Sequence, residues 1–74
     1  MGPIICTQYE FTTVYPSMSG ATYVREHVIV KGRRAYWGGR SIARAAAASK
    51  IAQWRRWAAT CPEQSVRRQV ARAY

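Results

Sequence analysis

The first half of the chain alternates between apolar and polar positions with the period of a β-strand. Residues 4–15, IICTQYEFTTVY, are rich in β-branched and aromatic residues, which favour extended structure. Successive side chains of a strand point to opposite faces. One side of this segment carries Tyr9, Phe11, Thr13 and Tyr15. The pattern therefore predicts a half-buried strand over residues 4–15.

Two further strands are predicted after the first. Residues 16–20, PSMSG, are typical turn residues, and residues 21–31, ATYVREHVIVK, alternate again. One face of this second strand carries Val24, Glu26, Val28 and Val30. Lys31-Gly32 predicts a compact turn, because glycine adopts positive φ without strain. Residues 33–37, RRAYW, return as a short third strand, which we expect Gly38-Gly39 to end.

A long helix is predicted over residues 42–59. The segment contains no Gly or Pro and is rich in alanine, which has the highest helix propensity. Ser41 is a suitable N-cap residue. The apolar positions gather on one helical face, and its small alanines allow close approach to a sheet. That face carries Ala43, Ala47, Ile51, Trp54 and Ala58. We expect Trp54 in the core and Trp57 at the edge of the apolar stripe.

The residues after this helix predict a second, shorter helix. Thr60 and Glu63 have the spacing of a capping box. Val66 and Val70 are spaced for one face of a helix over residues 62–74. The expected order is therefore β-β-β-α-α. This is an α+β fold with a three-stranded antiparallel meander, a long helix packed on one face and a short C-terminal helix.

The charge of the chain is large and unevenly placed. The formal net charge is +9 in 74 residues. Residues 1–24 contain one charged residue, Glu10, whereas all twelve Lys and Arg lie beyond them. Such asymmetry favours an anionic partner, which is nucleic acid, a membrane surface or an acidic protein. A compositional bias toward Arg and Ala is the alternative explanation, but it would not keep the first 24 residues free of arginine.

The length predicts a single small basic domain over residues 1–74. This is near the lower size limit for independent folding, and so thin a core is compatible with a homodimer. No apolar run approaches the roughly 20 residues that cross a bilayer. The chain also does not begin with a basic segment followed by an apolar run. These features favour a cytoplasmic protein.

Residue types that perform catalysis are sparse. The chain has no Asp, three scattered Glu and a single histidine, His27, so a carboxylate pair or a Mg²⁺ site is not expected. Cys6 and Cys61 lack the spacing of a metal site, and we expect both to be reduced and partly buried. A disulfide between them remains open. We therefore expect no enzymatic activity, no metal and no cofactor.

The candidate binding residues surround the predicted third strand and the long helix. Arginine forks match phosphate geometry, and Arg40 precedes a helix N-terminus, where free N–H groups favour anions. Tyr36 and Trp37 offer rings for base stacking, although strand alternation places one of them in the core. The candidate site for nucleic acid or an acidic partner consists of Arg33, Arg34, Tyr36, Trp37, Arg40, Arg44, Arg55 and Arg56. A secondary basic patch consists of Arg67, Arg68 and Arg72.

The segment VIVKGRRAYWGGRS contains a turn and a pair of glycines and ends at Ser41, after which an alanine-rich helix is predicted. In these features, residues 22–54 resemble the second half of a double-stranded-RNA-binding domain. The positions that match the alanines of that family are Ala45, Ala48 and Ala52. Its phosphate-binding lysines are not matched, because Ile42 and Ala43 stand there. Its first helix is replaced by a strand. The resemblance implies a sheet with a packed helix, and implies RNA binding less directly.

Three predicted strands followed by a helix are also similar to the arm-site DNA-binding domains of phage integrases, which lay a sheet into the major groove. The small size, the missing catalytic groups and ARAAAASKIAQW behind a hairpin resemble small phage-encoded anti-CRISPR inhibitors in style. Two functions follow as expectations. The first is a non-enzymatic module that binds DNA or RNA mainly through phosphate contacts. The alternative is an inhibitor that docks on a protein or nucleoprotein effector complex and blocks or diverts its nucleic-acid binding.

Binding to a membrane surface is a third expectation. It would use the predicted basic helix over residues 62–74. The apolar face of that helix would carry Val66, Val70 and Ala73. This face is too small for tight insertion, so we rank membrane binding below the other two functions.

Overall fold

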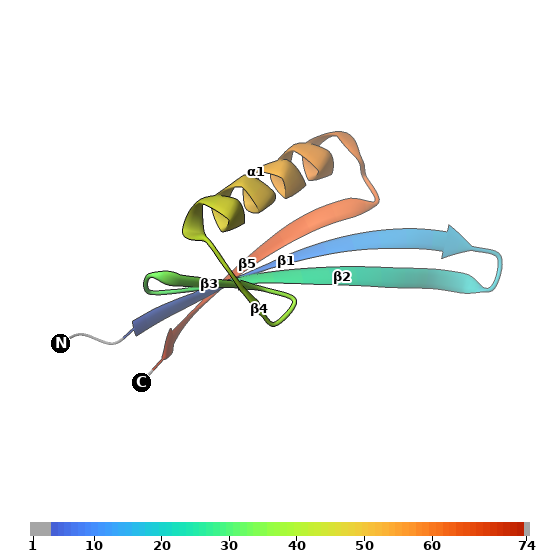
Figure 1. Cartoon of the computed structure of the whole chain (residues 1–74). Coiled ribbons are helices and arrows are strands. Elements are labelled where there is room, and N and C mark those ends of the chain that lie inside the picture. Colours follow the sequence, from blue (N-terminus) through green and yellow to red (C-terminus); the bar gives the residue numbers. More distant parts are fainter. Residues whose placement is uncertain (1–3, 74) are drawn as a thin grey trace.

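The computed structural model describes residues 4–73, which form one antiparallel sheet with a helix packed on it (Figure 1). Within this range the side chains of Ile4, Arg72 and Ala73 lie outside the description. The elements in chain order are β1 (Ile4–Ser17), β2 (Gly20–Lys31), β3 (Arg34–Trp37), β4 (Arg40–Ile42), α1 (Arg44–Thr60) and β5 (Gln64–Ala73). The strand order across the sheet is β4-β3-β2-β1-β5, so α1 connects the two edge strands.

The segments expected for the first three strands form β1, β2 and β3, with ends that differ by one or two residues. Lys31 pairs with Arg34, so the turn between β2 and β3 has two residues, Gly32 and Arg33. Gly32 has a φ of 58° and Arg33 does not have a positive φ, as in a type II′ turn with glycine in its first position. The observed fold belongs to the predicted α+β class.

The expected end of the sheet at Gly38-Gly39 is wrong, because these glycines form a second hairpin turn. Their φ angles are 57° and 82°, and two successive positive φ angles define the type I′ turn that Gly-Gly favours. The chain therefore returns as β4, and Ser41 pairs with Tyr36 in this strand. Ser41 is not the N-cap of the helix. The N-cap is Ala43, which makes no side-chain capping hydrogen bond.

The predicted second helix over residues 62–74 is also wrong, because Gln64–Ala73 forms the edge strand β5. The expected fold of three strands and two helices is thus corrected to five strands and one helix among residues 4–73. β5 pairs with the outer edge of β1 in one continuous register from Ile4–Ala73 to Thr13–Gln64. This pairing satisfies backbone groups of β1 that a helix would leave unpaired.

The core lies between α1 and the face of the sheet beneath it. Trp54 is fully buried and stacks on Phe11, with 5.3 Å between ring centroids. Trp57 is 43% exposed and meets the same ring at a tilt. The buried residues are Phe11, Val28, Ala35, Ala47, Ile51 and Trp54. The expectation of Trp54 in the core is therefore confirmed.

A two-stranded arm extends from the body of the molecule (Figure 1). β5 pairs with β1 only as far as Thr13, and β3 pairs with β2 only from Val28 onward. β1 and β2 continue to pair beyond these limits as far as their turn. We call residues 14–24 the arm. It gives the molecule an elongated shape with principal extents of 52 × 22 × 20 Å.

Candidate functional site

The face of the sheet opposite α1 has no covering element among residues 4–73 (Figure 1). Phe11 and Val28 are buried under α1, so alternate residues of each strand point to the other side. Cross-strand pairing aligns these side chains in rows. We call this surface the open face. It carries the basic residues Arg25, Lys31, Arg34 and Arg67, the tyrosines Tyr23 and Tyr36, and the polar residues Gln8, Thr12, Ser41, Ser65 and Gln69.

One end of the open face is basic. Lys31 and Arg34 pair across β2 and β3, so their side chains are neighbours on the same face. Together with Arg33 and Tyr36 they line a recess of about 400 Å³ at the turn between the two strands. The structure therefore places three of the candidate residues, Arg33, Arg34 and Tyr36, around one recess and adds Lys31 to them.

The middle of the open face is organised around one carboxylate. Glu10 accepts a hydrogen bond from Thr12 at 3.4 Å, and its Oε2 lies 3.0 Å from Nε2 of His27. Its Oε1 lies 3.9 Å from Nε of Arg25. The hydrogen bond with His27 is the main cause that lowers the pKa of Glu10, and the positive charges of His27, Arg25 and Arg67 add to it, while partial burial opposes them. This carboxylate thus remains ionised and offsets part of the local positive charge.

Amide and aromatic side chains lie in the row between Glu10 and the basic end. Gln8 of β1 is flanked by Ile29 on one side and by Gln69 of β5 on the other. Ile29 pairs in turn with Tyr36 of β3. The row therefore combines one ring with two amides, each of which can donate and accept hydrogen bonds.

Trp37 and Arg40 point to the side of the sheet that carries α1. They pair with each other, and Trp37 also pairs with the buried Val28. The Trp37 ring stacks against the ammonium of Lys50, whose Nζ lies 4.1 Å from the ring centroid. Arg40 is thus separated from Arg34 by the length of β3. The structure does not bring these two candidate residues into one cluster.

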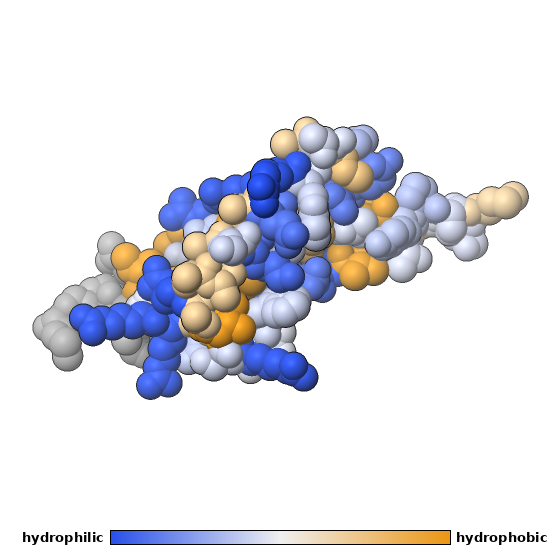
Figure 2. Space-filling view, turned by 45° about the horizontal axis from the view of Figure 1, so that its top comes forward, coloured by the Kyte–Doolittle hydropathy of each residue, from blue (hydrophilic) through white to orange (hydrophobic). Residues whose placement is uncertain are grey.

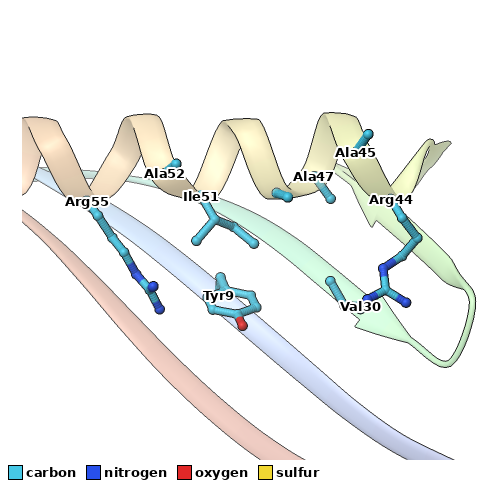
Figure 3. Close-up of a pocket in the computed structure, with 9 residues that line it drawn as sticks. Tyr9, Val30, Arg44, Ala45, Ala47, Ile51, Ala52 and Arg55 are labelled. Atoms are coloured by element: carbon cyan, nitrogen blue, oxygen red, sulfur yellow. The ribbon is translucent and has the colours of Figure 1, made fainter.

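Arg44 and Arg55 flank a groove between α1 and the sheet (Figure 3). Arg44 donates a hydrogen bond from Nη1 to the carbonyl of Gly32. The guanidinium of Arg55 lies 5.8 Å from the ring centroid of Tyr9. The groove has a volume of about 680 Å³. Between the two arginines it is lined by Tyr9, Val30, Ala45, Ala47, Ala48, Ile51 and Ala52.

The remaining candidate residues are dispersed. Arg56 is exposed on α1, and Arg67 lies on the open face near Glu10. Arg68 pairs with Tyr9 and therefore lies on the same side as α1. Arg72 pairs with Ile5 in β5, but its side chain lies outside the described residues. The secondary patch is therefore split between two faces, because adjacent residues of a strand point in opposite directions.

The open-face residues that sequence reasoning missed include Gln8, Arg25, Lys31 and Gln69. Strand alternation carried the signal for Arg25 and Lys31, which occupy odd positions of the predicted second strand together with His27. The signal for Gln69 was hidden, because its segment was expected to be a helix. Gln8 alternates with the aromatic side of the first predicted strand, and its residue type alone indicates no role.

Cys6 and Cys61 are free and partly buried, as expected. Among residues 4–73, no group of three or more His, Cys or Glu side chains is arranged to hold a metal ion. No helix within the same range is long and apolar enough to cross a membrane.

Comparison with known proteins yields no relative. No protein-family model, curated protein sequence or solved structure matches the chain significantly. The functional argument therefore rests on the arrangement of its own residues.

Proposed function

We propose that this protein binds nucleic acid through the open face of its sheet, mainly by phosphate contacts. The observation that carries the proposal is the composition of this one uncovered surface. Its basic residues lie at the end and the middle of the face, with an amide and tyrosine row between them. Figure 2, which looks toward the side that carries α1 and not onto the open face, shows hydrophilic side chains over the body of the molecule and an arm that is pale to tan.

The basic residues of the open face are spaced for an extended polyanion. Lys31 and Arg25 are six residues apart on β2, which corresponds to about 20 Å along a strand. A nucleic-acid backbone advances about 3.4 Å per nucleotide along a duplex axis, so this span covers about six nucleotides. Lysine and arginine at such a spacing bind phosphates and contribute little sequence specificity.

The row between the basic residues supplies groups that contact bases. The Tyr36 ring is only partly buried, and aromatic rings stack on bases of any sequence. Gln8 and Gln69 carry amides, which bind the edge of adenine in the major groove. The face therefore offers weak base preference in addition to phosphate affinity.

A salt series tests this proposal. Four phosphate contacts, one for each of Arg25, Lys31, Arg34 and Arg67, predict a slope of log K against log salt of about −3.6 on duplex DNA and about −2.8 on a single strand. Affinity for a duplex and a single-stranded oligonucleotide is measured at rising salt. A lack of binding at low salt, or a slope near zero, would refute the proposal.

A second candidate function is docking on a protein or nucleoprotein effector complex as a small inhibitor. The groove between α1 and the sheet favours it, because its apolar lining ends in Arg44 and Arg55. Such a surface suits an acidic, partly apolar segment of a protein better than a polyanion without apolar side chains. Capture of a partner that survives nuclease treatment supports this function, and capture that nuclease abolishes supports the first.

A further inference from the structure

The arm is a two-stranded ribbon that lacks a covering layer. Every residue from Tyr15 to Val24 is exposed. Tyr15, Tyr23 and Val24 are 56%, 55% and 48% exposed, and Met18 projects fully into solvent at the tip. Isolated two-stranded ribbons are marginally stable in water, because neither face buries apolar surface. The ribbon therefore lacks the packing that stabilises the rest of the sheet.

The arm also has a free strand edge. β3 begins to pair with β2 at Val28, and the carbonyl of His27 accepts a hydrogen bond from the Gly38 amide. No described residue pairs with the outer side of Gly20–Glu26. We call this segment the free edge. The opposite edge of the arm is shorter, because the Val14 amide donates to the Glu63 carbonyl and leaves only Tyr15–Ser17 unpaired.

The free edge lacks the usual protection against pairing with another strand. Edge strands are normally protected by lysine, proline or a bulge. The free edge contains no lysine or proline, and the register of β1 with β2 runs to the turn without a bulge. Charge is confined to Arg25 and Glu26 at its base. The part from Gly20 to Val24 is therefore open to a further strand.

The distribution of charge along the chain indicates which kind of partner pairs with the free edge. Residues 11–24 contain no charged side chain, so the arm does not attract phosphates. In an antiparallel pair of arms from two copies, the two basic bodies lie at opposite ends. The five residues from Gly20 to Val24 hold them about 15 Å apart, which exceeds the screening length of about 8 Å at physiological ionic strength.

We propose that the free edge pairs with the same edge of a second copy of this chain, forming a two-fold symmetric dimer with one continuous sheet. Antiparallel pairing of identical edges is self-complementary, as a two-fold interface requires. It satisfies the outward N–H and C=O groups of both free edges. It also brings the exposed Tyr23 side chains of the two copies near each other, where cross-strand aromatic pairs stabilise a sheet. This inference is independent of nucleic-acid binding.

Sedimentation velocity of the complete chain without nucleic acid tests the proposal. Over a series from about 1 µM to about 1 mM, we expect a species with twice the mass of one chain that dissociates on dilution. Tyr23→Lys on the free edge should shift the dissociation constant upward by tenfold or more. The matched control is Tyr15→Lys on β1, which has the same exposure and should keep the dimer.

Hydrogen exchange of the unmodified chain provides a second measurement that does not depend on a variant. Backbone amides of the free edge that point outward should be protected at high concentration and lose this protection on dilution. Amides that pair β1 with β5 should not change. A monomer at every concentration, larger assemblies, or equal loss of the dimer in both tyrosine variants would overturn the proposal.

Discussion

Trp54 and Trp57 lie about one turn apart on α1 and differ in burial. Trp54 is fully buried, whereas Trp57 is 43% exposed. The Nε1 atom of Trp54 has no hydrogen-bond partner within the described part of the chain, so its burial depends on packing alone. Because Trp54 and Val28 are the largest fully buried side chains, the small core depends heavily on this one ring.

Replacing Trp54 by alanine should therefore unfold the protein. Loss of a buried aromatic side chain costs about 3–5 kcal/mol, which is comparable to the total stability of a small domain. Trp57→Ala is the matched control and should cost about 1 kcal/mol, because much of that ring is already in water. Denaturant unfolding followed by circular dichroism measures both. Equal losses would contradict the assignment of Trp54 to the core.

Glu10 should make the free energy of unfolding depend on pH in the acidic range. Its pKa lies below the ordinary value of 4.5 in the folded protein. The folded state therefore binds this proton less readily than the unfolded state does. The resulting stabilisation is complete above about pH 4.5 and is lost as pH falls through the folded pKa. The side chain is partly solvated, so the contribution should be below about 1 kcal/mol.

Unfolding free energies at pH 7 and below pH 4 measure this effect. Glu10→Gln should reduce the loss of stability between these two pH values. Glu26→Gln is the control, because Glu26 pairs with Phe11 and points to the opposite face of the sheet. A Glu10→Gln protein with the same pH dependence as the unmodified chain would show that the carboxylate is not stabilised in this way.

The β5 strand shows why part of the fold could not be predicted from the sequence. Val66 and Val70 are four residues apart, and this spacing places them on one face of a helix and also on one face of a strand. Local pattern alone therefore does not separate the two structures. The exposed edge of β1 favours the strand over the helix, because ten residues of β5 pair with this edge. That edge is a tertiary feature, whereas the alternation that predicted β1 and β2 is local.

The candidate site was predictable where alternation was recognised and was not where an element was missed. Arg34 and Tyr36 both belong to the candidate site expected from the sequence, and the structure places them on one face of a short strand. Arg40 was grouped with Arg34 because Gly38-Gly39 was interpreted as a stop rather than a turn. Arg67 and Arg68 were grouped as helical neighbours, and β5 places them on opposite faces.

The turn between β3 and β4 should tolerate asparagine better than alanine. Gly38 has a φ of 57°, a conformation that costs an ordinary residue about 1–2 kcal/mol but that asparagine adopts more readily. No neighbouring atom would contact an added Cβ, so the cost comes from the backbone alone. Thermal unfolding should therefore rank Gly38→Asn above Gly38→Ala in stability. The reverse order would contradict the assigned turn type.

The whole molecule separates two basic surfaces across one thin sheet. Arg34 and Lys31 lie on the open face, whereas Arg55 and Arg56 belong to α1 on the other side. Net charge is a property of the whole chain and affects binding to any polyanion. A binding face, in contrast, is defined by the basic side chains that neutralise phosphates when the nucleic acid docks, because these contacts release its bound counterions. Variants with the same net charge can therefore distinguish the two.

Two double variants make this comparison. Lys31→Gln with Arg34→Gln removes two positive charges from the open face, and Arg55→Gln with Arg56→Gln removes two from α1. Each double variant lowers the net charge of +9 by the same two units. The first should lower nucleic-acid affinity and make the salt slope less negative by about 1.8, since each lost phosphate contact removes about 0.9. The second should change the slope by less than about 0.5 on the same scale. If both variants reduced the slope equally, binding would follow net charge and not the open face, and a larger reduction in the helix variant would place the interface on α1.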